Sequence, residues 1–486
     1  MTKKVKEIRF HAIDKGCVSH SCVGQWRNPK SDALHYKDIE HWQNFARIAE
    51  EGLFETVFIA DGLHVPDVFR GNDLEALRDA VEVPVIDPLT IAAASASVTK
   101  NIGFGITAGV FFEHPFPFAR RLSSMDHLTK GRVSWNIVTG YLPSVFHNMG
   151  IKILPHDERY DYADEYMEVI YKLLEGSWED DAVILDYESG AFADPYKIHH
   201  IGHHGKYFDV PGVHICEPSI QRTPVLFQAG SSSRGIEFAT THAEAIFIGA
   251  LGTEHAKQKV KQIRKGLVEK GRDPYDAKIF AGSIAIITDE TQALAEAKYK
   301  DYFKYVNTDG VLANCSGWMG VDLSKFNLDD PLNKISPRDM HISKMDAIYE
   351  STKDDGHAWT LRDVINRHSF GGGGPKFVGD PKHVADLIQK YVDDLDIDGL
   401  ILSYVVNPGT IEDVVHYIVP ELQRRGAYKT EYAHGSLRNK LFGRGDRLPD
   451  NHIGSKYRVG GARSTINDYA ESTGRVENQA AGNAVS

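Results

Sequence analysis

Cysteine is scarce in this chain: four residues among 486, none of them in a CxxC pair. Cys17 and Cys22 are close enough in sequence to suggest a metal or redox site. Without a second pair, however, reduced thiols in a reducing compartment are the better interpretation. The sequence also lacks a signal peptide and any apolar run that approaches the ~20 residues of a membrane span. We therefore expect a cytoplasmic protein without membrane contact.

Positive charge is also in short supply. The 55 Lys and Arg residues are outnumbered by 67 Asp and Glu residues, which gives a net charge of −12. A general nucleic-acid partner requires a basic face, so this composition argues against one. Hydrophobic residues make up 42% of the chain, which is enough for a large core.

Strand-like and helix-like segments alternate along the chain. Several strand candidates are apolar throughout, as in parallel strands that are buried on both faces. Helices are predicted at 39–52, 87–100, 115–129 and 157–176. Strands are predicted at 8–13, 56–61, 102–110, 132–140, 224–230, 244–250, 278–288 and 399–405. Repeated units of this kind give an open doubly wound sheet or a closed barrel, and eight of them favour an α/β fold of the (β/α)₈ type.

The barrel is predicted to span residues 1–442 as a single domain, with two long insertions at about 181–222 and 306–375. Insertions in barrels usually lie at the carboxyl-terminal loop face, so both are expected to form walls or lids of a pocket. Residues 443–486 are poor in apolar side chains and are expected to form a flexible C-terminal extension.

Small polar residues follow several predicted strands, at the end where barrel sites lie. Asp61, Thr107 and Thr139 stand at or near the ends of three strands, and "AGSSSRG" (229–235) follows another. The sequence shows no nucleophile with its base and no paired carboxylates at catalytic spacing. A site of hydroxyls and backbone amides is suited to a large polar cofactor.

Two helix starts are candidate anion sites. His156 and Tyr160 lie at the first turn of the helix predicted at 157–176, where free N–H groups and the helix dipole favour negative charge. Ser231 and Ser232 lie in "AGSSSRG", directly before another helix. Such a Gly/Ser turn is more often an ordinary turn when taken alone. Together, the two adjacent loops predict a shared phosphate site.

The histidines allow more than one interpretation. "HHIGHH" (199–204) lies in an insertion, and no Cys or carboxylate at ligand spacing completes a metal site. We therefore expect a surface or pocket-wall loop and no metal. His20 follows the first strand and is either a hydrogen-bonding group of the pocket or a packed polar residue, with the two alternatives equally supported.

Long motifs connect the chain to a known family. They include "VSHSCVGQWRNP", "FIADGL", "HLTKGRVSWNIVTGYL", "HDERYDYADEYMEVIYKLLEGSWEDDA", "HHGKYFDVPG", "RTPVLFQAGSSSRG" and "IVPELQRRG". From about residue 8 to 443 the chain resembles the bacterial-luciferase-like, FMN-dependent monooxygenases, in the branch of the nitrilotriacetate, dibenzothiophene-sulfone and dimethylsulfide enzymes.

The resemblance implies reduced FMN bound at the carboxyl ends of the barrel strands. Asp61, Thr107 and Thr139 would line its isoalloxazine ring and ribityl chain. The ribityl and phosphate end would contact His156, Tyr160, Ser231 and Ser232. His20 and, more weakly, His11 on the first strand are expected as catalytic residues near the reacting atoms.

The resemblance also implies partners and a reaction. An NADH-dependent flavin reductase would supply the reduced FMN, and O₂ would add at the flavin C4a atom to give a hydroperoxide that oxygenates a small molecule. Family members of this type suggest a homodimer or homotetramer. The expected substrate is a small organosulfur compound, with dimethyl sulfide, oxidised to methanethiol and formaldehyde, as the specific expectation.

Alternatives remain open. The same mechanism could act on an aminopolycarboxylate, a sulfone or another xenobiotic. A non-catalytic flavin-binding protein would keep the phosphate site, and an unrelated metal-dependent barrel hydrolase would use the "HHIGHH" loop.

Overall fold

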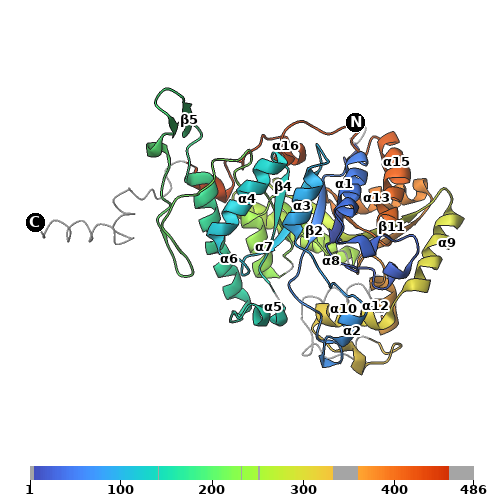
Figure 1. Cartoon of the computed structure of the whole chain (residues 1–486). Helices are drawn as coiled ribbons and strands as arrows, with labels where there is room; N and C mark the ends of the chain where they lie inside the picture. Colours follow the sequence, from blue (N-terminus) through green and yellow to red (C-terminus); the bar gives the residue numbers. More distant parts are fainter. Residues whose placement is uncertain (1–4, 141, 231, 250–251, 332–358, 459–486) are drawn as a thin grey trace, which may run out of the picture.

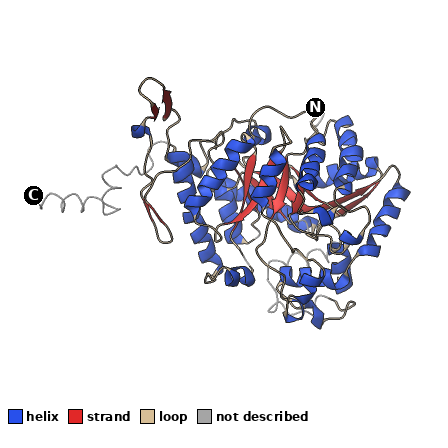
Figure 2. Cartoon of the chain, in the orientation of Figure 1, coloured by secondary structure: helices blue, strands red, loops and turns tan. Residues whose placement is uncertain are grey.

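The computed structural model describes residues 5–140, 142–230, 232–249, 252–331 and 359–458. Parallel strands form a closed barrel at its centre, surrounded by helices (Figures 1 and 2). Pairing follows the order β10-β9-β4-β3-β2-β1-β13-β11, and a further β10–β11 pairing closes the barrel. The strands are β1 (Arg9–Lys15), β2 (Thr56–Ala60), β3 (Gly103–Gly109), β4 (Val133–Val138), β9 (Val225–Gln228), β10 (Ala245–Ile248), β11 (Lys278–Thr288) and β13 (Gly399–Ser403). The predicted (β/α)₈ barrel and its eight strands are confirmed.

Helices follow the strands and cover the outside of the barrel, so that each strand is buried on both faces. They are α1 (Ile39–Glu51), α3 (Pro88–Ala96), α4 (Pro115–Thr129), α6 (His156–Tyr171), α7 (Ser233–His242), α8 (Thr253–Glu269), α13 (Pro381–Leu395), and α14 (Gly409–Asp413) with α15 (Val419–Arg424). The helix predicted at 157–176 corresponds to α6, which continues as a π-helical turn over Lys172–Gly176.

The amino-terminal end of the barrel is filled and closed. Phe58, Phe227 and Phe280 pack inside it together with Leu437 and Leu441 of α16 (Leu437–Phe442). Aromatic side chains supply much of this packing: the rings of Phe58 and Phe227 meet edge to face, and those of Phe227 and Phe280 are stacked. The barrel interior is therefore a packed core at this end.

The carboxyl-terminal end is covered by a second, smaller core. It is built from α10 (Thr308–Met319) and α12 (Leu361–His368), which lie with α2 (Leu74–Arg78) below the barrel in Figure 1. Val311, Met319 and Val364 pack there against Val23 and Phe69 from the loops after β1 and β2. The described parts of the 306–375 insertion thus cover the loop face, as expected; residues 332–358 lie outside the described residues.

The 181–222 insertion lies elsewhere. It follows α6 rather than a strand, and its end is tied to the amino-terminal side, where the Gln221 backbone N–H donates to Asp126 near the end of α4 (2.8 Å). Its hairpin, β5 (Val183–Asp186) and β6 (Ala191–Ala193), projects from the molecule in Figure 1. A second ribbon, β7 (His203–His204) and β8 (Asp209–Val210), contacts the outside of α6 through Glu165. The expectation that this segment forms a pocket wall or lid is wrong, because an insertion after a helix emerges at the opposite end of the barrel.

The described part of the C-terminal extension packs against the barrel. Arg447 and Arg458 form ion pairs with the buried Glu175, and the Tyr457 ring stacks on Tyr171. Residues 443–458 are therefore docked rather than free, which differs from the expected flexible segment; 459–486 lie outside the described residues. Among the described helices, none combines the length and the apolar character that a membrane crossing demands.

Candidate functional site

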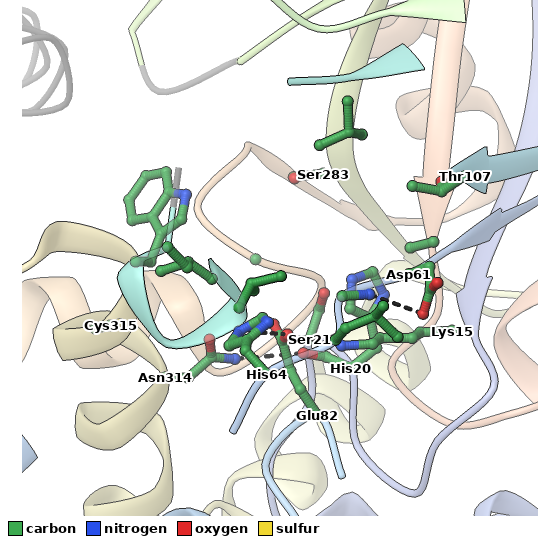
Figure 3. Close-up of a pocket in the computed structure, with 18 of the residues that line it drawn as sticks. Lys15, His20, Ser21, Asp61, His64, Glu82, Thr107, Ser283, Asn314 and Cys315 are labelled. Carbon is green, nitrogen blue, oxygen red and sulfur yellow. Dashed lines mark hydrogen bonds and ion pairs between the residues drawn. The ribbon is translucent and has the colours of Figure 1, made fainter. Parts of the chain in front are cut away.

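A cavity of about 320 Å³ opens at the carboxyl-terminal end of the barrel (Figure 3). One side is formed by strand ends and the loops that follow them, and the other by α10 and the glycine-rich loop after α12. Its polar lining residues are Lys15, His20, Ser21, Asp61, His64, Glu82, Thr107, Ser283, Asn314, Cys315 and His368. Of the predicted site residues, the structure brings His20, Asp61 and Thr107 together in this cavity.

The strand ends present small groups to the cavity. Asp61 follows β2, and its carboxylate accepts a hydrogen bond from the Gly62 N–H (2.8 Å), while burial raises its pKa. Thr107 of β3 accepts a hydrogen bond from the Asn136 side-chain amide (3.1 Å). Thr139 is half-buried between Val138 and Gly140, which both line the cavity. Small side chains and glycines leave room for a flat ring system at this end.

Charged and ionisable groups gather in one part of the lining. The Lys15 ammonium lies 2.9 Å from Glu82 Oε2, and His64 Nε2 lies 3.5 Å from the same oxygen. The His20 carbonyl accepts a hydrogen bond from Asn314 of α10 (3.3 Å), which ties the loop after β1 to the covering helix. Figure 3 shows Lys15, His20, His64 and Glu82 close together.

Burial and charge set the ionisation of this cluster. Burial alone would raise the pKa of Glu82, but the Lys15 ammonium, His20 and His64 together outweigh it and bring that pKa to about 2. Burial lowers the pKa of His20 to about 4, and it also lowers that of His64. At neutral pH the cluster therefore consists of one ion pair flanked by two neutral imidazoles, each able to donate or accept a proton.

Two helix starts meet at the end of the barrel where the cavity opens, because α6 and α7 follow the neighbouring strands β4 and β9. A methyl group at Gly235 in the first turn of α7 would lie 2.8 Å from the Tyr160 hydroxyl, so the two turns are in close contact. Ser232 caps α7, and its hydroxyl accepts from the Gly235 N–H (3.0 Å). The His156 ring packs against Tyr160, with its Nδ1 2.6 Å from Asp157. Ser231 lies outside the described residues.

This arrangement fits a phosphate group. Free N–H groups of two helix starts, two hydroxyls and an imidazole converge there, and the dipoles of both helices favour negative charge. Glycine is required for the close approach, since a methyl group at Gly230 would lie 2.4 Å from the Gly235 carbonyl oxygen.

His11 does not reach the cavity. It is fully buried in the barrel, with its Nδ1 2.8 Å from the Thr56 hydroxyl and its ring edge-on to Phe280. Burial lowers its pKa to about 3. His11 lies four residues before the end of β1 and so sits below the level of the cavity, and its expected catalytic role stays a prediction that this position does not favour.

Lys15, Glu82 and His64 were missed by sequence reasoning. Lys15 is the last residue of β1, so the strand-end criterion that selected Asp61 could have found it. Glu82 and His64 lie within loops, where no periodic pattern marks a functional side chain. "HHIGHH" forms separate pairs, in which His199 contacts Glu179, His203 contacts Glu165 and His204 contacts Asp209.

A model of the luciferase-like monooxygenase family matches residues 16–396 of the sequence. With this match, the barrel and the cavity at its carboxyl end, the chain belongs to that family and is a flavin-dependent monooxygenase.

Individual relatives are similar to this chain over nearly its whole length. The chain is 48% identical over 455 residues to dimethyl-sulfide monooxygenase of Hyphomicrobium sulfonivorans, covering 93% of this chain and 94% of the relative. It is 46% identical to long-chain alkane monooxygenase of Geobacillus thermodenitrificans, covering 94% and 99%. The crystal structure of DmoA from Hyphomicrobium sulfonivorans superposes with a TM-score of 0.89 at 47% identity, covering 95% and 98%.

Proposed function

We propose that the protein uses reduced FMN and O₂ to oxygenate a small organosulfur compound, as the larger component of a two-component system. The observation that carries the proposal is the cavity at the strand ends beside two converging helix starts. It offers one space for a flat ring and an adjoining site for a phosphate.

Two sets of residues would bind the two ends of the cofactor. Asp61, Thr107 and Thr139 would hold the ring and ribityl chain, while the turns that carry His156, Tyr160 and Ser232 would hold the phosphate; Ser231 belongs to the same proposal. When bound, reduced FMN supplies the electrons that activate O₂. The covering α10 and the loop after α12 would exclude water from the reacting atoms.

His20 is the proposed proton donor or acceptor in the cavity. Its neutral imidazole lies on the lining beside Glu82 and Lys15, and the loop that carries it is held by Asn314. A neutral histidine can accept a proton from the substrate side or donate its N–H as a hydrogen bond. His20→Gln should lower turnover more than it lowers affinity for FMN.

Dimethyl sulfide is the first substrate to test, because a relative named for it is 48% identical over most of both chains. One oxygen atom would enter a methyl group, and the other would leave as water with two electrons and two protons. The C–S bond of the hydroxylated product then breaks to give methanethiol and formaldehyde. A relative named for long-chain alkanes is nearly as similar, so a hydrocarbon is the second candidate.

The electrons would come from a separate NADH-dependent flavin reductase. This proposal includes a cytoplasmic location, where NADH is available to the reductase, and assembly as a homodimer or homotetramer. Mixing the protein with such a reductase, FMN and NADH should give substrate oxidation that neither component gives alone.

The deciding experiment is an anaerobic titration with photoreduced FMN, followed by O₂ and dimethyl sulfide. Preferential binding of reduced FMN with release of methanethiol supports the full proposal. Preferential binding and O₂ consumption without methanethiol would retain the monooxygenase and reject this substrate. Equal binding of both FMN redox states without O₂-coupled product would instead indicate a non-catalytic flavin-binding protein.

A further inference from the structure

Lys15 and Glu82 form a charged pair in the cavity wall that the proposed function leaves unused. Lys15 closes β1 and Glu82 lies in the loop between α2 and α3; their side chains are only 2% and 19% exposed. Removing two charges from water is unfavourable unless further hydrogen bonds satisfy them, so such a pair is weak evidence for a stabilising role. Its position on a cavity suggests a role toward a ligand.

The hydrogen-bonding capacity of this cluster is not filled. A lysine ammonium has three N–H donors. Among the described residues, Lys15 Nζ donates one hydrogen bond, to Glu82 Oε2. His64 Nδ1 is buried and has no partner within the described part of the chain. Both groups converge on Gly62, where a methyl group would lie 2.9 Å from the His64 ring and 3.5 Å from Lys15 Nζ. A methyl group would collide with the His64 ring, so glycine is required at this position where both groups approach the loop after β2.

The cluster is also held in place before any ligand arrives. The Glu82 N–H donates to the Ser19 carbonyl (2.8 Å), which joins the loop after α2 to the loop after β1. Glu82 adopts a φ of 58°, a left-handed conformation that non-glycine residues seldom occupy. Residues kept in such conformations cluster at functional sites.

Much of the remaining lining is apolar. Phe112, Val145, Val311 and Trp318 face the same cavity as Lys15 and Glu82. A thioether or an alkane would satisfy the apolar part but would cover the Lys15 ammonium without offering its remaining N–H groups an acceptor oxygen. Leaving a buried polar group unpaired is unfavourable, whereas an acceptor oxygen on the ligand would restore the hydrogen bonds.

We infer that Lys15 and Glu82, with His64, form the polar end of the substrate compartment and select an organosulfur substrate that carries an acceptor oxygen. A carboxylate or a sulfone supplies such an oxygen, while dimethyl sulfide and alkanes do not. This inference rests on the proposed function and narrows its substrate class, and it predicts that dimethyl sulfide binds more weakly than an organosulfur compound with an acceptor oxygen.

The test compares ligand binding to the FMN-loaded protein and to its K15M/E82Q variant. Both residues are replaced at once because either single change leaves a buried charge without its partner. The ligands are (methylthio)acetate, dimethyl sulfone and dimethyl sulfide, each followed by flavin absorbance and calorimetry. Wild type should bind the two oxygen-bearing compounds about tenfold or more tightly than dimethyl sulfide, as expected for one charge-assisted hydrogen bond. The K15M/E82Q variant should lose that preference.

A matched control is the K172M/E168Q variant, which removes the ion pair between Glu168 of α6 and Lys172 of the following turn (2.7 Å), outside the cavity lining, and should leave the preference intact. Equal affinity of wild type for all three ligands would overturn the inference. So would a K15M/E82Q variant that loses affinity for FMN but keeps the ligand preference, since the pair would then belong to the cofactor site. Selective binding without turnover of any of these compounds would support the inference and refute the proposed reaction.

Discussion

Both ends of the barrel bury charged side chains, but the hydrogen bonds of Arg438 and Glu244 at one end are more complete than those of Lys15 and its neighbours at the other. At the amino-terminal end, Arg438 is 1% exposed and donates from Nε and Nη2 to the Glu244 carboxylate at 2.7 and 2.8 Å. Its Nη2 also donates to the Thr223 carbonyl (2.9 Å), and its Nη1 to that of Asp446 (2.8 Å). At the carboxyl-terminal end, Lys15 has the single carboxylate partner Glu82, and His64 Nδ1 has none among the described residues.

The difference separates a structural network from a binding surface. A fully satisfied buried network fixes the packing around it and has no capacity left for a ligand. An incomplete network beside a cavity retains donors and acceptors that a ligand can use. The same kinds of residue thus hold α16 against the barrel at one end and line the candidate site at the other.

The largest expected effect comes from breaking the amino-terminal network. Arg438→Met leaves Glu244 buried without its partner and should lower the free energy of unfolding by about 3–5 kcal/mol. Urea denaturation followed by circular dichroism measures it. The double variant R438M/E244Q should recover much of the loss, and its FMN affinity should match wild type. A loss below about 1 kcal/mol in R438M would mean that this network does not hold the barrel end.

Lowering the pH should reduce the stability of the protein through His452, which is buried at the amino-terminal end of the barrel. Its Nδ1 accepts from the Gly454 N–H (3.0 Å) and its Nε2 lies 2.8 Å from the His242 carbonyl, so only the neutral ring fits. Burial lowers its pKa to about 4. Between pH 6.5 and 4 the unfolded chain binds a proton that the folded chain does not, so stability falls as the pH falls.

The matched variant is His452→Asn, which keeps an acceptor for Gly454 and does not titrate. Its free energy of unfolding should depend less steeply on pH across that window, by up to about 1.4 kcal/mol per pH unit. Urea denaturation at several pH values measures the slope. Parallel slopes in both proteins would show that His452 is protonated in the folded state as readily as in the unfolded chain.

A substitution at the carboxyl-terminal end tests whether the two helix starts bind the phosphate of FMN. Gly235→Ala places a methyl group 2.8 Å from the Tyr160 hydroxyl and 3.1 Å from the Gly230 Cα, so the two helix starts must move apart. We expect FMN affinity to fall about tenfold or more, the equivalent of one good hydrogen bond lost to the phosphate. Gly212→Ala, where nothing lies within 4 Å of the added methyl, is the control. Unchanged FMN affinity in G235A would place the phosphate elsewhere.

The smallest effect is expected in the 181–222 segment. Lys197 forms an exposed ion pair with Asp181, and such pairs contribute little to stability. Lys197→Ala should therefore leave the melting temperature, FMN affinity and ligand preference unchanged within error. A changed ligand preference would mean that this segment contributes to the site after all.

Much of the fold could be predicted from the sequence because burial on both faces leaves a local signature. Runs such as Val225–Gln228 and Gly399–Ser403 are buried throughout, and their continuous apolar character indicates parallel strands. The proximity of Tyr160 to Gly235 could be inferred as well, since neighbouring parallel strands deliver their following helices to the same end. The place of residues 181–222 was also available from chain order, because the segment follows a helix.

Which residues line the site together could be established only from the tertiary structure. His11 and Lys15 are both polar residues of β1, yet one lies in the packed core and the other on the cavity. Their depth depends on where the aromatic packing inside the barrel ends, and no local pattern records that level. Lys15 and Glu82 are 67 positions apart, and a loop held by Ser19 brings them together. A strand can be predicted because its neighbouring residues are buried together and form an apolar run. The pairing of Lys15 with Glu82 depends instead on contacts between loops, which leave no periodic pattern in the sequence.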